Sequence, residues 1–101
     1  MKQDWEVLEF DFIGFEWDDE KAEGNWRKHG IDFEEAKDIF KDPVLAQAQF
    51  EGGEDRWCVI GAAGGRELIV VFAERDEFCR IISAWRADRK SRAWYYEVLG
   101  R

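Results

Sequence analysis

The stretch Glu67-Leu68-Ile69-Val70-Val71-Phe72-Ala73 decides the fold. Its residues from Leu68 to Phe72 are all apolar, so a strand formed by them is apolar on both faces. A strand with one solvated face alternates apolar and polar residues, whereas a continuous apolar run is typical of a strand that is covered on both faces. We therefore expect this stretch to be the central strand of a β-sheet.

Further strand-like stretches precede and follow it, at Val44–Phe50, Arg56–Ala62 and Phe78–Trp85. Short polar or glycine-rich connections separate these stretches, and connections of this length join neighbouring antiparallel strands as hairpins. The simplest arrangement is an antiparallel meander. Upstream, apolar and acidic residues alternate from Leu8 to Phe12, so we expect residues 1–14 to be an acidic N-terminal extension with an edge strand.

Two helices are predicted between this extension and the meander. The first spans residues 19–29, because an aspartate of the Asp18-Asp19 pair can cap its start and Gly30 can adopt the left-handed conformation that ends it. The second begins at a capping box, Asp32–Glu35, and ends before Pro43. Because the turn between them is so short, we expect the two helices to form a hairpin that packs on the sheet.

A C-terminal helix is predicted at Ala87–Leu99, where apolar residues recur at helical spacing. The expected fold class is therefore α+β, with an N-terminal helical hairpin packed on a twisted antiparallel β-sheet and a C-terminal helix. A chain of 101 residues has room for one such core, so we expect a single domain over residues 1–101.

Composition excludes several classes of protein. Hydrophobic residues make up 46% of the chain and charged residues 38%, which rules out a disordered tail. The longest apolar run is too short to span a bilayer and the charged N-terminus lacks a signal peptide, so we expect a cytoplasmic protein without a membrane partner. Cys58, Cys79 and His29 cannot form a disulfide framework or a four-ligand zinc site, so neither a metal nor a cofactor is expected.

Charge is distributed unevenly along the chain. The net charge of −8 by itself argues against binding to nucleic acid. However, residues 1–55 contain six Lys and Arg against seventeen Asp and Glu, whereas residues 56–101 contain nine against six. Eight of those nine are arginines, whose planar guanidinium groups are well suited to phosphate. The second half is therefore the part in which a polyanion site is expected.

Several arginines lie at the ends of predicted strands and at the start of the last helix. Regular alternation would place Arg80 and Arg86 on the same face of their strand. A basic groove with an exposed aromatic ring would suit single-stranded RNA, which is bound through phosphates and stacked bases. The candidates are Arg75, Arg80, Arg86, Arg89, Lys90 and Arg92, with Trp85, Trp94 or Tyr95 as the ring. The alternative is a solvated face whose arginines pair with carboxylates of the first half.

His29 is a candidate for proton transfer, because histidine is the side chain that ordinarily titrates near neutral pH. It follows two basic residues at the predicted C-terminus of the first helix. In that position it can act as a general acid or base, or it can simply interact with the helix dipole. The two cysteines lie on predicted strands, where a thiol is usually a small buried hydrophobe, so we expect no role for them.

The run from Phe15 to Ala36, FEWDDEKAEGNWRKHGIDFEEA, resembles the opening signature of the BrnT family, F-x-W-D-x-x-K-x-x-x-N-x-x-K-H-G-[IV]-x-F-x-E-A. Further along, Val70–Arg75 and Arg80–Ala84 are also similar to the family, and Tyr95 stands at its late tyrosine. The resemblance covers roughly residues 15–97, and several separate motifs occur in the family's order.

This resemblance implies the toxin of a bacterial type II toxin–antitoxin pair. Such a toxin would be a metal-independent endoribonuclease with a RelE-like fold that cleaves RNA and inhibits translation. Its implied partners are the RNA substrate and a cognate DNA-binding antitoxin that neutralises it, with assembly into a dimer or a heterotetramer with that antitoxin.

The resemblance also implies a set of site residues, onto which the reaction can be placed. Arginines would stabilise the charge on phosphorus while the 2′-hydroxyl attacks the adjacent phosphate, and His29 or Tyr95 would transfer a proton. The expected catalytic residues are His29, Arg75, Arg80, Arg86 and Tyr95, and Lys28 also matches the signature as an expected RNA-binding residue. The other expected RNA-binding residues do not come from the resemblance but from their type and position in the basic second half: Trp85, Arg89, Lys90 and Arg92.

Three features depart from the family pattern. Trp85 stands where the family usually has Arg, Ser91 stands where it usually has Glu, and an acidic extension precedes Phe15. The first departure removes a cation from the expected phosphate surface and adds an aromatic residue of the kind that anchors protein interfaces. The alternative function is therefore a catalytically weakened interaction module that mainly binds its antitoxin.

Overall fold

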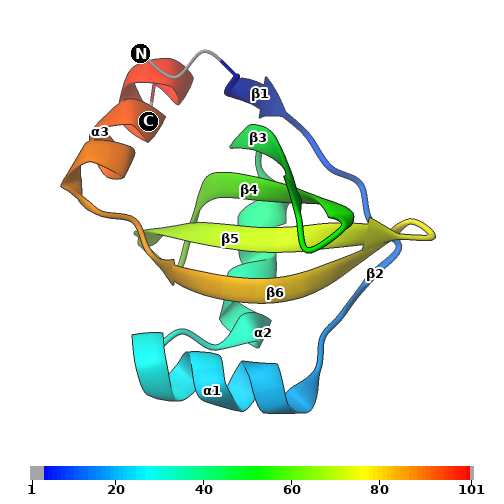
Figure 1. Cartoon of the computed structure of the whole chain (residues 1–101). Coiled ribbons are helices and arrows are strands. Elements are labelled where there is room, and N and C mark those ends of the chain that lie inside the picture. The colour runs from blue at the N-terminus through cyan, green and yellow to red at the C-terminus, as the bar shows by residue number, and fades with distance from the viewer. Residues whose placement is uncertain (1–3, 101) are drawn as a thin grey trace.

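The computed structural model describes residues 4–100 and consists of one six-stranded sheet with helices at both of its faces (Figure 1). The strand order is β1-β3-β4-β5-β6-β2. The α+β class predicted from the sequence is confirmed. The strands are β1 (Glu6–Leu8), β2 (Gly14–Glu16), β3 (Val44–Glu51), β4 (Glu54–Ala63), β5 (Arg66–Arg75) and β6 (Phe78–Arg86).

The predicted meander forms β3 to β6, in which each strand pairs antiparallel with the next. Glycine pairs with positive φ make the first two hairpin turns. The third turn contains Asp76 and Glu77 at φ of 51° and 69°, a conformation that residues other than glycine adopt infrequently. Because these turns are short and the strands antiparallel, the end of each strand lies beside the start of the next strand.

The central position predicted for Leu68–Phe72 is confirmed, since these residues lie in β5, an interior strand. Leu68, Val70 and Phe72 are buried in the larger hydrophobic core. Ile69, on the opposite face, belongs to a smaller core beneath the C-terminal helix. Four of the five residues are buried, on one face or the other, and only Val71 is partly exposed, which explains why this strand shows no polar alternation in the sequence.

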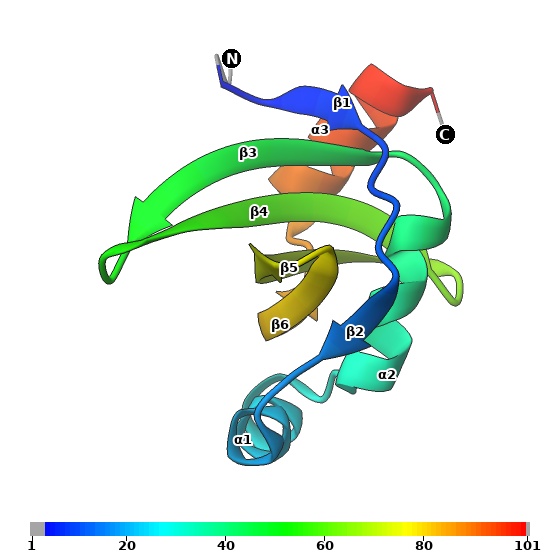
Figure 2. The ribbon, with the colours of Figure 1, turned by 90° about the vertical axis from the view of Figure 1, so that its right-hand side faces the viewer.

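The N-terminal segment does contain an edge strand, β1, but the predictions that it spans Leu8–Phe12 and that the sheet is purely antiparallel are wrong. The N-terminal segment forms two short strands at opposite edges: β1 pairs antiparallel with β3, and β2 pairs parallel with β6, so the sheet is mixed. Between them the chain crosses one face of the sheet, on the side where the helical turn α2 (Phe33–Ala36) lies (Figure 2). The aromatic rings of Phe10 and Phe12 cause this crossing, because they pack on Phe72 in the larger core instead of continuing a strand.

The first predicted helix is confirmed as α1 (Asp19–His29). The Asp18 carboxylate accepts hydrogen bonds from the amides of Glu20 and Lys21, and Gly30 ends the helix in the left-handed conformation at φ 69°. This helix needs no distant contact to define its ends, since both are fixed by residues next to it in the chain.

The predicted N-terminal helical hairpin is wrong, since two strands precede α1 and only one helical turn, α2 (Phe33–Ala36), follows it before the 3₁₀-helix η1 (Lys37–Lys41). Phe33, Ala36 and Ile39 are all buried on the sheet at a spacing of three residues. A 3₁₀-helix aligns residues three apart, so this tighter winding keeps the row of apolar side chains on the core.

The predicted C-terminal helix is confirmed as α3 (Arg89–Leu99), which begins at the N-cap Asp88. It packs over one end of the sheet face opposite α2, where Tyr95 meets Leu45, Ile60 and Ile69 in the smaller core. Among the described residues, no helix is long and apolar enough to cross a membrane.

Candidate nucleic-acid interface

A β-bulge at Ile82 decides which way the arginines of β6 point. The register between β5 and β6 shifts here, so that Ile82 has no partner opposite it. Arg80 lies opposite Ala73, whereas Arg86 lies opposite Leu68 in the larger core. Because neighbouring residues in register share a face, Arg80 and Arg86 lie on opposite faces of the sheet. The expectation that they share a face is wrong, since the extra residue reverses the alternation.

The face that carries Arg80 is only partly covered by α3. Figure 1 looks onto this face, with α3 over its left end and the turn between β5 and β6 at its right. Away from α3, residues such as Gln47, Cys58, Val71 and Ser83, which pair in register across this face, are partly exposed. This uncovered half of the sheet is open to a partner or substrate.

A pocket of about 230 Å³ lies at the end of the uncovered half, and we call it the arginine pocket. Four cationic side chains and two carboxylates surround it, so its lining is positive although the whole chain is negative. It is lined by Asp18, Lys21, Glu54, Arg56, Ala73, Arg75, Arg80, Ile81 and Ile82. The site therefore combines β4, β5 and β6 with the N-terminal end of α1.

Each arginine of the pocket is held by a carboxylate. Arg56 Nη2 lies 3.1 Å from Glu54 Oε2, and Arg75 Nη2 lies 3.7 Å from Glu54 Oε1. Arg80 Nη1 lies 3.3 Å from Oε2 of Glu16 on the neighbouring strand β2. The arginine side chains range from 21% to 53% exposed. Partly exposed ion pairs of this kind are weak, so a phosphate can replace the carboxylates at little cost.

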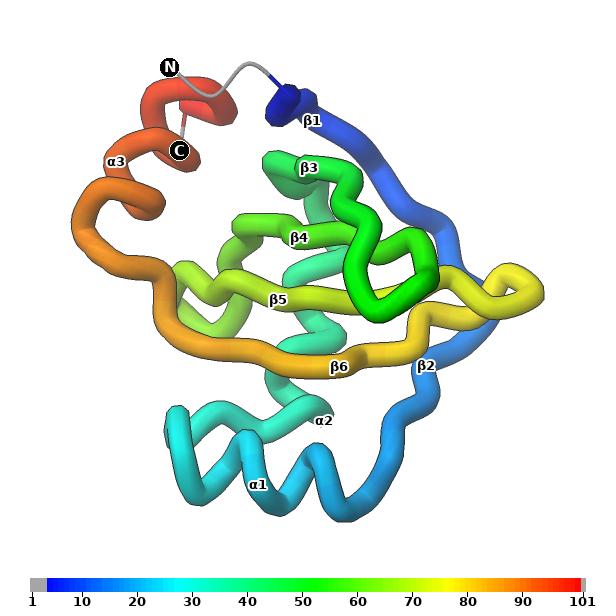
Figure 3. The backbone as a smooth tube through the Cα atoms, viewed as in Figure 1, coloured from blue at the N-terminus to red at the C-terminus, as the bar shows by residue number. Residues whose placement is uncertain are grey.

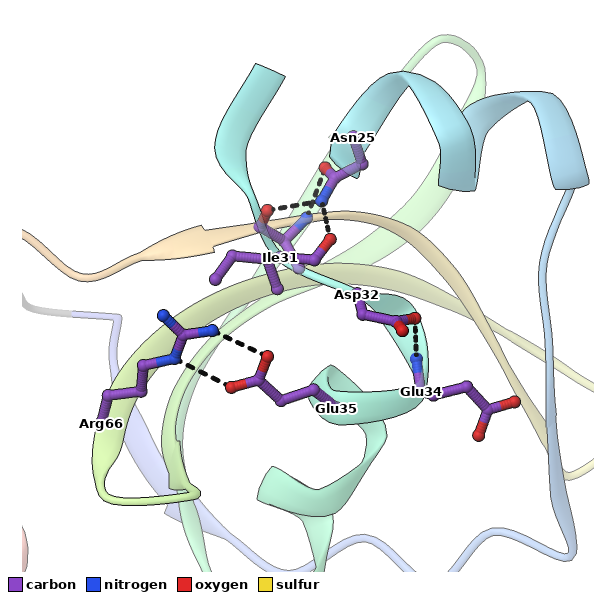
Figure 4. Close-up of polar contacts among 7 residues, drawn as sticks. Asn25, Ile31, Asp32, Glu34, Glu35 and Arg66 are labelled. Carbon is purple, nitrogen blue, oxygen red and sulfur yellow. Dashed lines mark hydrogen bonds and ion pairs between the residues drawn. The ribbon is translucent and has the colours of Figure 1, made fainter. Parts of the chain in front are cut away.

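Asn25 fixes α1 beside the pocket. Its Nδ2 donates to the carbonyl oxygens of Ala84, at 2.8 Å, and Ile31, at 3.1 Å, while its Oδ1 accepts from the Ala84 amide at 3.0 Å (Figure 4). The side chain thus takes the place of a neighbouring strand where β2 has ended. As a result α1 runs along β6 (Figure 3), and Asp18 and Lys21 reach the arginine pocket.

The other end of α1 holds a second group of predicted residues. Lys28 and His29 are exposed there, and the His29 ring centroid lies 5.9 Å from that of Trp85. Trp85 is half-buried and packs against the smaller core. None of these residues lines the arginine pocket, so the structure does not bring His29 together with Arg75 and Arg80.

The remaining predicted residues also lie away from the pocket. Arg86, Arg89 and Lys90 are exposed at the end of β6 and the start of α3. Arg92 donates to the Ala87 carbonyl at 3.5 Å and lies 3.8 Å from Glu67 Oε1. Tyr95 is 1% exposed in the smaller core, so its side chain is not accessible to an RNA substrate in this structure.

The comparison with known families gives the identity of the chain. The profile described as "Ribonuclease toxin, BrnT, of type II toxin-antitoxin system" matches residues 17–91. The chain belongs to the BrnT family. The resemblance noted in the sequence is thereby confirmed, and members of this family are ribonuclease toxins of type II systems, whose activity implies an antitoxin partner.

A solved BrnT structure has a similar fold. The ribonuclease toxin BrnT of Brucella abortus is 29% identical, with a TM-score of 0.59, over 76% of this chain and 99% of the Brucella chain. A search of curated proteins gave no match. The BrnT profile covers every residue that lines the arginine pocket, whereas β1 and β2 lie before it.

The sequence analysis did not include three residues that line this candidate site, Lys21, Glu54 and Arg56. A signal for Glu54 and Arg56 existed in the predicted meander: antiparallel hairpins bring the start of β4, the end of β5 and the start of β6 to one end of the sheet. Lys21 stands in the family signature, but only the contact of α1 with β6 places it beside the arginines. Among residues 4–100, no group of three His, Cys, Asp or Glu side chains is arranged to hold a metal ion.

Proposed function

We propose that this BrnT protein is a metal-independent endoribonuclease that binds single-stranded RNA across the uncovered half of its sheet and inhibits translation. A cognate DNA-binding antitoxin neutralises it. The observation that carries the proposal is the convergence of Arg56, Arg75, Arg80 and Lys21 on one pocket. Arginines from three different strands and a lysine from α1 thus line one hollow.

The chemistry of these groups fits a phosphate at the scissile bond. A guanidinium group binds phosphate oxygens with paired hydrogen bonds and stabilises the additional negative charge that develops on phosphorus in the transition state. The negative charge of the whole chain acts weakly at this site, because salt screens exposed charges beyond about 8 Å at physiological ionic strength. Local cations therefore dominate once RNA is in contact, while the overall charge slows its approach.

The test compares Arg80→Ala with Arg27→Ala in cleavage of a single-stranded RNA oligonucleotide with a metal chelator present. Arg27 is a suitable control because it is an exposed arginine on α1 that pairs with Glu23. Loss of one transition-state donor costs about 10²-fold or more in rate, so we expect that loss for Arg80→Ala and near wild-type cleavage for Arg27→Ala. Equal rates for both variants, or cleavage that stops in the chelator, would contradict the proposal.

The alternative function is an interaction module that mainly binds its antitoxin. It is favoured by one observation: the arginines of the pocket already form ion pairs with Glu54 and Glu16, so they are not free to bind phosphate unless these pairs break. In this case the purified protein leaves RNA intact, its expression without the antitoxin does not arrest growth, and it still binds the antitoxin tightly. Growth arrest that Arg80→Ala abolishes would exclude this alternative.

A further inference from the structure

Cleavage of RNA without a metal needs two proton transfers. A base must remove the proton of the 2′-hydroxyl, and an acid must protonate the 5′-oxygen that leaves. The sequence assigned this work to His29 or Tyr95. However, neither residue lines the arginine pocket: His29 lies at the far end of α1, and Tyr95 is in the core beneath α3. The groups that transfer protons must be sought in the lining itself.

The lining contains two carboxylates, Asp18 and Glu54. Asp18 Oδ1 accepts hydrogen bonds from the amides of Glu20, at 2.8 Å, and Lys21, at 3.1 Å, and this contact caps α1. Asp18 therefore has a structural role as the N-cap of α1, which makes it a poor candidate for proton transfer. In contrast, the Glu54 carboxylate contacts the guanidinium groups of Arg56 and Arg75, which are the groups expected to turn toward phosphate.

We propose that Glu54 is the general base and Lys21 the general acid of the cleavage reaction; this inference rests on the proposed function. The Glu54 carboxylate takes the proton of the 2′-hydroxyl as the 2′-oxygen bonds to phosphorus. The bond between phosphorus and the 5′-oxygen breaks, and that oxygen leaves with a proton from the Lys21 ammonium group. The products are a 2′,3′-cyclic phosphate and a 5′-hydroxyl. Water then takes the proton from Glu54 and returns one to Lys21.

The positions of the two residues fit an in-line displacement, in which the attacking and leaving oxygens are on opposite sides of phosphorus. Glu54 comes from β4, and Lys21 comes from α1, which packs along β6. Because β5 lies between β4 and β6, the arginines of β5 and β6 separate the two elements that carry the base and the acid. A phosphate held by Arg75 and Arg80 would thus have Glu54 on one side and Lys21 on the other.

Other charged groups surround this pair and influence the pH dependence of the reaction. Among the described residues, those that face Glu54 or line the pocket with it are Arg56 on its own strand, Glu51 on β3, Arg75 on β5, Arg80 on β6 with its partner Glu16 on β2, and Asp18 on α1. Glu51 contacts Arg56 at 3.7 Å but does not line the pocket, so it provides a matched control for Glu54.

The test uses two RNA oligonucleotides that differ only in the leaving atom, which is oxygen in one and sulfur in the other. Sulfur leaves without being protonated, so it removes the need for a general acid but not for a base. Removing a proton-transfer group costs about 10²–10⁴-fold in rate, so we expect Glu54→Gln to lose this much kcat on both substrates and to lose the acidic limb of the pH–rate profile. Lys21→Met should lose rate on the oxygen substrate and recover it on the sulfur substrate.

Control variants separate catalysis from positioning. Glutamine can still accept a hydrogen bond from Arg56, so Glu54→Gln retains the arrangement of the arginines and should change KM little. Glu54→Asp, which retains a carboxylate, should recover part of the rate, and Glu51→Gln should cleave like the wild type. If Glu54→Gln keeps its kcat and its acidic limb, Glu54 is not the base; if Lys21→Met is equally slow on both substrates, Lys21 is not the acid. Wild-type protein that cleaves neither substrate overturns the proposed function itself.

Discussion

The side chain of Asn25 hydrogen-bonds both backbone groups of Ala84, donating to its carbonyl at 2.8 Å and accepting from its amide at 3.0 Å. Asn25 is 7% exposed, so water has little access to these groups. An asparagine is well suited to this position because its amide offers a donor and an acceptor together, as a peptide group does. This contact joins the first helix to the sheet and thereby completes one wall of the arginine pocket.

Replacing Asn25 with alanine should destabilise the protein strongly. The variant leaves the buried amide and carbonyl of Ala84 and the carbonyl of Ile31 without these partners, and the loss should be about 2–4 kcal/mol of unfolding free energy. Denaturant unfolding followed by tryptophan fluorescence measures it. Glu23→Ala, on the exposed side of the same helix, should change stability by no more than about 0.5 kcal/mol. Equal unfolding midpoints for the two variants would contradict this role of Asn25.

Phe12 should be essential for the attachment of the N-terminal segment. Its ring packs edge-on against Phe40 and Phe72, with centroids 5.4 Å and 5.5 Å apart. Because the ring is only partly buried, we expect Phe12→Ala to cost about 2–3 kcal/mol. Its neighbour Ile13 is 66% exposed, so Ile13→Ala should be almost neutral in the same unfolding experiment. Comparable losses for both would mean that the segment is not held by its aromatic rings.

The pair of Glu35 and Arg66 should make stability depend on pH. Arg66 donates two hydrogen bonds of 2.8 Å to the Glu35 carboxylate (Figure 4), and these hydrogen bonds lower the pKa of Glu35. A lowered pKa means that the folded state releases this proton more readily than the unfolded state. The stabilisation is therefore complete above the ordinary pKa of a glutamate and is lost as the pH falls through the lowered value.

Unfolding of Glu35→Gln at several pH values tests this dependence. Near neutral pH the variant should be less stable than the wild type by about 1 kcal/mol, and in acid, near pH 3, the difference should shrink. Glu34→Gln, which removes a more exposed pair with Lys37, provides the control and should show only a small difference throughout. A Glu35→Gln difference that is the same at every pH would show that the charge is not involved.

Salt should weaken RNA binding less in a variant that lacks a pocket arginine. Each phosphate contact with single-stranded RNA contributes about 0.7 to the slope of log affinity against log salt, so Arg75→Ala should reduce the slope by about this amount. Lys41→Ala is the control, because Lys41 is exposed in η1 and pairs with Asp38. Fluorescence anisotropy with a labelled, uncleavable oligonucleotide gives both slopes, and an unchanged slope for Arg75→Ala would place the phosphates elsewhere.

Local sequence signals predicted much of the fold. The ends of α1 are fixed by the cap of Asp18 and the left-handed Gly30, and the hairpins of the meander are fixed by short turns. Each of these depends on residues that are close in the chain. The crossing of the N-terminal segment was not predicted, because alternation around Phe10 and Phe12 is equally typical of a strand and of rings that pack on a distant core.

The candidate site was also predicted only in part, because only some of its residues are placed by features that are close in the chain. Arg75 and Arg80 were site candidates in the sequence because they lie at the ends of predicted strands and within the BrnT-like motifs, and both line the arginine pocket. Arg86 was predicted to lie on the same face as Arg80, but one bulged residue moves the side chains of all later residues in the strand to the opposite face. The sequence around Ile82 contains no signal for this bulge. Glu54 was missed because acidic residues are abundant in the first half, and only the folded structure distinguishes it from solvated carboxylates.

The N-terminal segment supplies both outermost strands of the sheet, β1 at one margin and β2 at the other. One segment of the chain therefore covers both margins of the meander, since β1 pairs with β3 and β2 pairs with β6. An unshielded margin offers unsatisfied backbone groups to other chains and invites self-association. Proteolytic removal of this segment would thus uncover the sheet at two margins in a single event, and the protein would become prone to polymerise.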